Sequence, residues 1–579
     1  MPQNPDALTN VEIAEVFERI ANLMEIKGEL VFKVRAYQRA AESLRDLPEE
    51  AAALDSRGEL PNVPGIGKAI TEKIQELLST GKLEFLNRLE DEVPPSLLDL
   101  LRVSGVGPKK VALFWKELGL LTLADLEAAA KAGKIATLPG MGAKTEANIL
   151  AGIAGLAARG SRMSLGKAYT AGQRWLAWLR EFPGVQRAEA AGSLRRFKET
   201  VGDLDLVVAC ADSPALMAAF TSHPNVVRVL GQGENKSSIE LHDGLRIQLW
   251  AQPSESFGAL WMYATGSKDH NVRLRELAQR RKLSLSERGL TDEAGNLLRY
   301  PTEEEVYSAL GLDWVPPELR EDRGEIDAAL NHRLPRLIET SDLRAELHSH
   351  STWSDGLLSI EDMALAAIQK GHKVLSVTDH SSYLGITRGM KPEDLPRQRA
   401  EIEAARKHLG DRILILHGAE VDIRADGVLD YPDEALAQLD IVIASLHASL
   451  RQPREQITAR LLNAIRNPHV DIIAHPTGRL LPDRAGADLD WQAVFQAVQE
   501  HGTALEINAA PQRLDTDDIH TRHAASLGIP ITINTDAHSA ADLDQAFYGV
   551  SVARRAGLEK DAVINTWEPD RITAWLKSR

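Results

Sequence analysis

The apolar and polar positions of the 579-residue chain follow three successive patterns. Residues 1–90 place apolar side chains three and four positions apart, as in VEIAEVFERIANLMEI and KVRAYQRAAESLRDL, which predicts short amphipathic helices. Alternating positions in LDLVV and in KSSIELHDGLRIQLW predict β-strands in the middle of the chain. From residue 343, seven short apolar runs alternate with helical stretches such as IEDMALAAIQKGH. The pattern predicts a multidomain chain, α+β and then α/β, ending in a distorted β/α barrel of about seven strands.

Three glycine hairpins stand between predicted helices in the first 150 residues. They read PGIGK at 64–68, SGVGPK at 104–109 and PGMGAK at 139–144. Glycine permits close backbone approach, and a helix N-terminus beside a lysine can receive a phosphate. One copy could be an ordinary helix turn, but three favour helix-hairpin-helix motifs that bind the DNA backbone without reading sequence. The candidate DNA contacts are Gly65, Gly67, Lys68, Gly105, Gly107, Lys109, Gly140, Gly142 and Lys144.

The stretch 192–208, GSLRRFKETVGDLDLVV, combines a phosphate-type turn with two acids on a strand. Strand side chains alternate, so Asp203 and Asp205 share one face, about 7 Å apart along the strand. Carboxylates in this arrangement can hold a pair of Mg²⁺ ions for phosphoryl transfer. Gly192-Ser193 offers backbone N–H groups and a hydroxyl, and Arg195 and Arg196 offer guanidinium forks for phosphate oxygens.

The apolar runs of the last 240 residues end in metal-ligand residue types. Thirteen of the 17 histidines lie after residue 341. Because the strands of a β/α barrel present functional residues at their C-terminal ends, these side chains are expected to converge at one rim. Any one of these histidines could be structural, but nine such positions together indicate a metal site. The candidates are His348, His350, Asp355, His380, Glu420, His447, His475, Asp536 and His538.

The 192–208 stretch resembles the nucleotidyltransferase signature of family X DNA polymerases, the DNA polymerase beta group. The resemblance implies metal binding by Asp203 and Asp205, with Mg²⁺ or Mn²⁺ as the cofactor. It extends to the stretch from Tyr263 to Arg275, and Ala264 there replaces one ring of the aromatic pair typical of the family. The implied nucleotide-binding residues are Gly192, Ser193, Arg196, Gly202, Tyr263, Gly266, Asn271 and Arg275.

The chain departs from that family at Gln248, which stands where the third catalytic aspartate is expected. A glutamine supplies a neutral oxygen where a carboxylate would offset metal charge. Residues 236–250 predict a β-hairpin about Asp243-Gly244. A two-residue turn there would pair Glu240 with Ile247, on the opposite face from Gln248, so Glu240 is not expected to replace the missing acid.

The first 90 residues resemble the amino-terminal lyase domain of the same polymerase group, in which a lysine forms a Schiff base with an abasic sugar. The resemblance places Lys73 at that position, with Tyr37 and Arg35 in the facing helix. Ala69 replaces another lysine of the family, although Lys68 is adjacent. The alternative interpretation of Lys73 is a helix lysine that contacts DNA or is simply solvated.

The candidate ligands after residue 341 resemble the PHP (polymerase and histidinol phosphatase) domain, and all nine metal positions of that family are present. The resemblance implies a trinuclear site for Mn²⁺ or Zn²⁺, with Fe²⁺ as a further choice, that hydrolyses phosphoesters by activating a water. It implies one ion on His348, His350, Glu420 and Asp536, a second on Glu420, His447 and His475, and a third on Asp355, His380 and His538. Asp379, Asp422 and Arg451 are candidates for supporting or phosphate-binding roles.

The resemblances together predict six segments. These are a lyase-like helical DNA-binding domain (1–90), a helix-hairpin-helix domain (91–160), a nucleotidyltransferase palm of mixed sheet and helices (161–253), a nucleotide-selection domain (254–318), a linker (319–342) and a PHP barrel (343–579).

Composition narrows the binding partners and the cellular compartment expected of the protein. The net charge of −16 does not exclude DNA, because some of the acids are needed as metal ligands. One cysteine, Cys210, excludes an intrachain disulfide framework and suits a reducing compartment. The polar start MPQNPDALTN and the lack of a long apolar run predict a cytoplasmic protein without membrane contact. A monomer is expected.

The sequence thus favours a DNA-repair polymerase that fills short gaps from deoxynucleoside triphosphates on gapped or nicked DNA with 3′ ends. Its barrel would act as a 3′–5′ exonuclease or 3′-end phosphoesterase. Two alternatives stay open. The palm could be degenerate, so that the polymerase half only presents DNA to an active barrel, or the protein could be a non-enzymatic scaffold that binds DNA ends.

Overall fold

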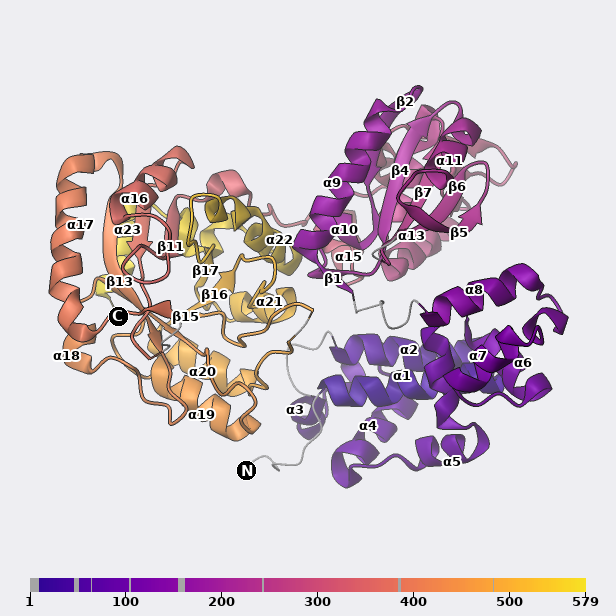
Figure 1. Cartoon of the computed structure of the whole chain (residues 1–579), viewed down its shortest axis with the longest axis horizontal. Coiled ribbons are helices and arrows are strands. Elements are labelled where there is room, and N and C mark those ends of the chain that lie inside the picture. Colours follow the sequence, from indigo (N-terminus) through magenta and orange to yellow (C-terminus); the bar gives the residue numbers. More distant parts are fainter. Residues whose placement is uncertain are drawn as a thin grey trace. The chain divides into compact units, whose positions relative to one another are not determined.

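The computed structural model divides into two compact units, Met1–Gly160 and Ser161–Arg579 (Figure 1). It describes residues 10–45, 51–63, 65–103, 106–154, 162–241, 244–383, 387–482 and 484–578. None of the helices within these ranges is long and apolar enough to cross a membrane. The finer boundaries inside each unit stay predictions.

The first unit is helical, as the spacing of its apolar residues predicts. Phe17 of α1 and Phe114 of α6 lie in one continuous apolar core. Its helices are α1 (Asn10–Lys27), α2 (Val31–Arg45), α3 (Ala51–Ser56), α4 (Lys68–Thr80), α5 (Glu84–Glu92), α6 (Pro108–Leu118), α7 (Leu123–Lys131) and α8 (Ala143–Ala154), and η2 (Pro95–Arg102) is a 3₁₀ helix.

Each glycine hairpin directly precedes a helix in this unit. Gly67 is the N-cap of α4 and Gly107 the N-cap of α6. Gly65 has φ +89°, and a Cβ there would lie 2.5 Å from Ser43 Oγ, so this turn requires glycine. Gly105 lies outside the described residues.

The second unit begins with the predicted palm, built on a five-stranded mixed sheet in the order β2-β4-β7-β6-β5. The interior strand β4 begins immediately after Asp203 and runs parallel to the central strand β7, where Asp205 lies beside Gln248. The palm elements are α9 (Leu165–Glu181), β2 (Val185–Ala190), α10 (Gly192–Arg195), β3 (Thr200–Val201), β4 (Leu204–Cys210), α11 (Ser213–Thr221), β5 (Val226–Gln232), β6 (Lys236–Leu241) and β7 (Arg246–Gln252), and β1 (Met163–Ser164) pairs with β3.

The predicted β6–β7 hairpin is confirmed, but its predicted register is wrong by one residue. Leu241 N–H donates to Leu245 O at 2.9 Å, so the turn contains three residues and Glu240 pairs with Arg246. Because side chains alternate, Glu240 lies on the same face as Gln248. Its carboxylate accepts a hydrogen bond from Arg228 Nε at 2.8 Å, so it is held in an ion pair towards β5.

A smaller helical and β segment follows the palm. It contains α12 (Phe257–Thr265), α13 (Lys268–Arg280), β8 (Ser284–Ser286), β9 (Gly289–Thr291), β10 (Leu297–Leu298) and α14 (Glu303–Ala309). Residues 319–342, predicted as a linker, contain α15 (Glu325–Leu330), one partner of a buried ion pair and one partner of a buried hydrogen bond. Arg320 binds Glu303 at 2.8 Å, and Glu325 contacts His270 at 2.6 Å. Two charged residues of this segment, Arg320 and Glu325, are therefore buried in the fold, whereas others such as Asp327 and Arg333 are exposed.

The barrel of the second unit confirms the seven predicted strands. They run parallel in sequence order, and β11 meets β17 through a bridge between Ser349 and Ala537, so the sheet nearly closes. The strands are β11 (Ala345–Ser349), β12 (Val374–Val377), β13 (Leu414–Asp422), β14 (Ile441–Ser445), β15 (Ile472–Ala474), β16 (Ala504–Asn508) and β17 (Ile531–Asn534).

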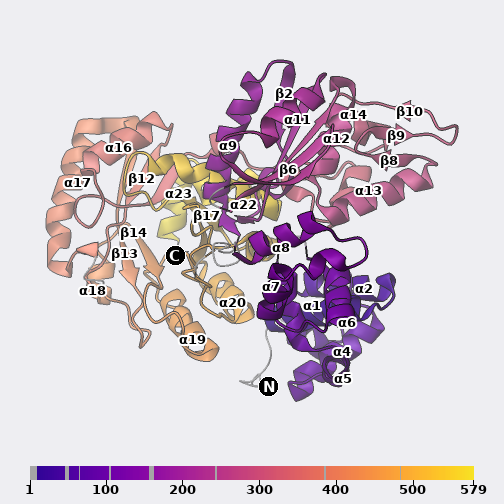
Figure 2. The same ribbon diagram turned by 45° about the vertical axis from the view of Figure 1, so that its right-hand side comes forward.

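Helices surround these strands (Figure 2). They are α16 (Ile360–Gln369), α17 (Leu395–Leu409), α18 (Asp433–Leu436), α19 (Arg454–Ile465), α20 (Trp491–His501), α21 (Asp518–Ser526), α22 (Ala546–Ala556) and α23 (Pro569–Lys577).

Candidate active sites

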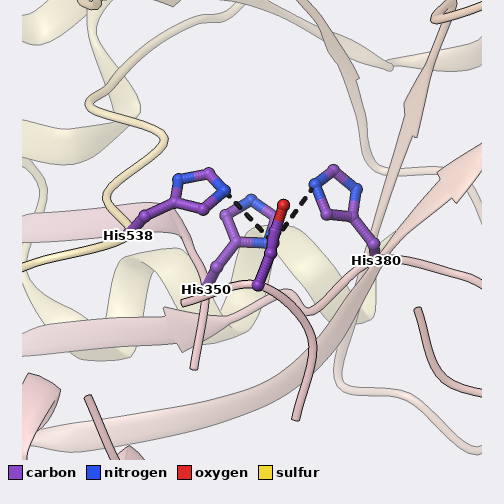
Figure 3. A group of neighbouring side chains, drawn as sticks. His350, His380 and His538 are labelled. Atoms are coloured by element: carbon purple, nitrogen blue, oxygen red, sulfur yellow. Dashed lines mark ion pairs between the residues drawn. The ribbon is translucent and has the colours of Figure 1, made fainter. Parts of the chain in front are cut away.

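The nine predicted ligands of the barrel meet at the C-terminal ends of its strands. Figure 3 shows His350, His380 and His538 directed towards a common centre. Ligand atoms within 4.8 Å of one another form three groups: His350 with Asp355, His380 and His538; His348 with His350, Glu420 and Asp536; and His380 with Glu420 and His447. His475 completes the cluster, with its Nε2 at 3.0 Å from Glu420 Oε1.

The donor atoms of this cluster fit metal ions. Among the described residues His348 Nε2, Asp355 Oδ1 and Glu420 Oε2 are buried without a hydrogen-bond partner. Such buried polar atoms cost free energy unless a ligand satisfies them. Burial alone would raise the pKa of Glu420, but the imidazoles of His380, His447 and His348 hold it well below its ordinary value. The result is a dense group of anionic oxygens and imidazole nitrogens, the ligand mixture that suits Mn²⁺ or Zn²⁺.

Two of the histidines are oriented by carboxylates behind them. His348 Nδ1–H donates to Glu506 Oε1 at 2.8 Å, and His447 Nδ1–H donates to Asp422 Oδ1 at 2.9 Å. Each bond fixes the tautomer and directs the Nε2 lone pair into the cluster. The predicted supporting role of Asp422 agrees with this geometry.

Sequence reasoning missed Glu506, which lies in β16, the one predicted strand without an assigned ligand. Glu506 Oε2 also accepts from the His475 backbone N–H at 2.8 Å, so one carboxylate holds two ligand positions. The available signal was its charge within the otherwise apolar run ALEIN. Asp379 is fully buried and accepts hydrogen bonds from Ser351 and Ser354, whereas Arg451 is exposed.

The palm contains a cavity of about 520 Å³ that gathers most of the predicted nucleotide site. Three further basic side chains line it that the sequence reasoning did not single out: Arg162, Lys198 and Lys268. The predicted residues that line it are Gly192, Ser193, Arg196, Asp203, Asp205, Tyr263, Gly266, Asn271 and Arg275, together with Ala264. Two acids beside a ring of basic groups suit a metal–triphosphate ligand.

The two palm aspartates have different surroundings. Burial and the neighbouring charge of Asp203 raise the pKa of Asp205 to about 7, the effect expected of two carboxylates held close together. Gly192 has φ +57°, and a Cβ there would lie 2.0 Å from Asp205 Oδ2. Gln248 Nε2 donates to Asp203 Oδ2 at 3.0 Å, so the glutamine faces the acids as its strand position predicts.

Two residues of the palm signature lie outside the cavity lining. Arg195, expected to bind phosphate, instead forms two hydrogen bonds to Glu303, at 2.6 and 2.7 Å, and its side chain is 11% exposed. It is therefore a structural residue of the fold. Gly202 does not line the cavity; a Cβ there would lie 3.3 Å from Arg162 Nη1.

The candidate DNA-binding lysines of the first unit, Lys68, Lys109 and Lys144, are exposed in the first turns of α4, α6 and α8. Lys73 Nζ lies 5.1 Å from the centroid of the Phe85 ring, on which Tyr37 stacks at 5.7 Å. An aromatic face stabilises an ammonium group. The geometry gives Lys73 a packing contact, and its lyase role stays a prediction.

The fold and the two sites define a family X DNA polymerase joined to a PHP domain, and the chain belongs to that bacterial family. It is 38% identical over 571 residues to the DNA polymerase/3′-5′ exonuclease PolX of Bacillus subtilis (strain 168), across 98% of this chain and 99% of that protein. Family profiles match the helix-hairpin-helix domain at residues 8–83, the SAM-like helix-hairpin-helix tandem at 97–154, the DNA polymerase beta thumb at 260–321 and the PHP domain at 346–510.

Each half of the chain also has separate relatives. A probable phosphatase of Thermoanaerobacter sp. (strain X514) is 31% identical over 251 residues, which cover 40% of this chain and 94% of that protein. DNA polymerase lambda of Rattus norvegicus is 25% identical over 342 residues, which cover 54% of this chain and 56% of that protein.

Proposed function

We propose that the protein is a DNA polymerase with a 3′–5′ exonuclease or 3′-end phosphoesterase activity in its barrel. The observation that carries the proposal is the convergence of all nine predicted ligands, several of which have buried ligand atoms without a hydrogen-bond partner among the described residues. The Bacillus subtilis relative, similar over nearly the whole chain, supports both activities, and the probable phosphatase supports the barrel activity.

In the barrel, divalent ions held by the nine residues would supply Lewis acidity, activating water and offsetting phosphate charge. The protein groups set the geometry for this chemistry. Glu506 and Asp422 keep one nitrogen of His348 and His447 directed inwards, and Glu420 lies between His348, His380, His447 and His475. We propose Mn²⁺ or Zn²⁺ at up to three positions, with Fe²⁺ as a further choice.

In the palm, Asp203 and Asp205 would hold Mg²⁺ or Mn²⁺, while Ser193, Arg196 and Arg275 bind the triphosphate of a deoxynucleotide. The cavity that these residues share supports the assignment. Tyr263 O accepts a hydrogen bond from Asn271 Nδ2 at 2.7 Å, which fixes the wall expected to contact the sugar.

A second candidate function is a degenerate palm that only presents DNA to the barrel. The contact between Gln248 and Asp203 favours it, because an amide occupies the position from which a third carboxylate would bind metal. We place the protein between a fully active polymerase and a degenerate palm, as a slow polymerase with an active barrel. We further propose gapped or nicked DNA as its substrate, a monomeric state and a cytoplasmic location.

Primer extension on gapped DNA tests the proposal. The wild type should extend slowly with Mg²⁺ and faster with Mn²⁺, which accepts imperfect sites more readily, and Asp205→Ala should abolish both reactions. Extension that persists undiminished in Asp205→Ala would exclude the palm as the site of synthesis. Absence of extension with either ion, alongside an active barrel, would establish the degenerate palm.

A further inference from the structure

The turn that carries the phosphate-binding residues of the palm rests on the barrel. In this turn, between α10 and β3, Glu199 Oε2 accepts a hydrogen bond from Arg479 Nη2 of the barrel at 2.7 Å. The Phe197 ring stacks on Tyr169 of α9, and the Tyr169 ring lies 5.2 Å from Phe547 of α22. Helix α22 lies beside the end of α9 in both views (Figures 1 and 2). The barrel therefore contacts the turn directly at Glu199 and supports Phe197 through Tyr169.

The most buried of these contacts is made by Arg555 of α22, whose side chain is 2% exposed. Its Nη1 donates to the backbone carbonyl of Arg196 at 2.8 Å and to Glu321 Oε1 at 3.0 Å. Its Nη2 donates to Asp518 Oδ2 at 2.9 Å. One guanidinium of the barrel thus binds both the main chain of Arg196 and the carboxylate of Glu321.

The same carboxylate oxygen also binds the side chain of Arg196. Arg196 Nε donates to Glu321 Oε1 at 3.1 Å, and its Nη1 donates to Thr265 O. Of its five N–H groups, those on Nη2 have no partner among the residues that the structure describes. Arg196 lines the nucleotide cavity, so this edge is available to an anionic ligand.

Arg195 provides the internal comparison. Its guanidinium is bound by Glu303 and Thr265, both from the polymerase half. Adjacent arginines of one turn are therefore anchored differently: Arg195 within the polymerase half, and Arg196 through a carboxylate that it shares with the barrel.

We propose that Arg555 is a positioning residue of the nucleotide pocket, so that the barrel helps to hold the nucleotide-binding residues of the polymerase half in place. The inference rests on the proposed function of the palm. Arg555 shares the charge of Glu321 and holds the Arg196 carbonyl, which keeps the Arg196 guanidinium aimed at the triphosphate. Without Arg555, Glu321 would draw Arg196 towards itself and the turn would lose its buried anchor.

The test is nucleotide binding to the full chain on gapped DNA with a dideoxy-terminated primer, so that no extension is required. Arg555→Met keeps the aliphatic volume and removes the charge; its dissociation constant for the matching deoxynucleotide should rise about tenfold, the effect expected of removing one charge-assisted hydrogen bond. Arg555→Lys keeps the charge but cannot reach all three acceptors, so its affinity for the deoxynucleotide should lie between that of the wild type and that of Arg555→Met. Hydrolysis of a small phosphoester by the barrel should be unchanged in both.

Arg554→Met is the matched control. Arg554 precedes Arg555 on α22 and also binds the segment before the barrel, at Glu318 Oε1 (2.7 Å) and Ile338 O (3.0 Å), but makes no contact with Arg196 or Glu321. The Arg554→Met variant should therefore leave nucleotide affinity unchanged. Equal losses of affinity in the two methionine variants, or none in either, would overturn the positioning role. A wild type that binds no nucleotide with either Mg²⁺ or Mn²⁺ would overturn the proposed palm function itself.

Discussion

The two candidate metal-binding regions of this chain differ in the number of ligands that they offer and in how those ligands are held in place. The barrel cluster has nine potential ligands, and two of its histidines have buried carboxylates behind them. The palm has two aspartates, and the third position carries Gln248, whose amide donates to Asp203. The barrel therefore offers nine candidate ligands, two of which are oriented by carboxylates behind them, while the palm offers one acid fewer than its sequence resemblance implies. This difference predicts that mutations will remove function from the barrel but can add function to the palm.

The largest effect is expected when two barrel ligands are removed. Changing His350 and Glu420 to Ala deletes two ligands that each belong to two groups and that together take part in all three. Phosphoester hydrolysis should fall about a thousandfold or more, because losing even one outer partner of a metal ligand costs roughly 10- to 100-fold. Bound metal, measured by elemental analysis, should fall in parallel. Primer extension is the control and should be unchanged; undiminished hydrolysis would place the reaction elsewhere.

Adding the missing charge to the palm gives the second prediction. Gln248→Asp should raise the extension rate by roughly ten- to a thousandfold, the span of about 1.4 to 4 kcal/mol in the barrier. A third acid also repels Asp203, so the melting temperature should fall without divalent ions and recover when they are added. Gln252→Asp is a matched control on the same strand and face, where Gln252 lies beside Ala209. Equal rates in all three proteins would mean that another group completes the site.

The third prediction tests whether the carboxylates behind the barrel histidines matter. Glu506→Gln keeps the shape of the side chain but removes the charge that fixes the His348 tautomer. Hydrolysis and metal affinity should fall roughly 10- to 100-fold. Thermal unfolding provides the check: a loss of activity with a nearly unchanged melting temperature would confirm orientation, whereas equal activity would show that His348 is held by its other contacts.

The barrel was also easier to predict from sequence than the palm. Its seven strands lie in largely apolar runs, and most of the ligands lie at or close to the C-terminal end of a run, so both the strands and the converging residues could be inferred. Glu506 was missed because its run, ALEINAA, ends in no residue of a metal-ligand type and was assigned no ligand. In the palm the Asp243-Gly244 pair suggested a two-residue turn, and the actual three-residue turn shifted the register by one.

Ion pairs between distant positions were beyond sequence reasoning. Arg320 and Glu325 belong to a segment that looked like a charged linker, but their partners Glu303 and His270 lie 17 and 55 residues away. Nothing in a local pattern identifies such partners, because burial of a charge depends on which elements the fold brings together. The same holds for Arg555, which binds a main-chain carbonyl 359 residues earlier in the chain.

The smallest expected effect concerns the hairpin lysines, which would bind the DNA substrate for both activities. Changing Lys109 and Lys144 to Glu should weaken binding to gapped DNA at physiological salt, and the logarithmic salt dependence should flatten by about one unit for each phosphate that is no longer neutralised. These lysines would contact the DNA substrate and lie outside both active sites. In the double variant the KM for DNA should therefore rise by the same factor for extension and for exonuclease hydrolysis, with both kcat values unchanged. Lys82→Glu, at an exposed lysine after α4, is the control for net charge alone. A rise in KM for only one reaction would show that the two sites bind DNA separately, and a salt-independent affinity would exclude backbone recognition by the hairpins.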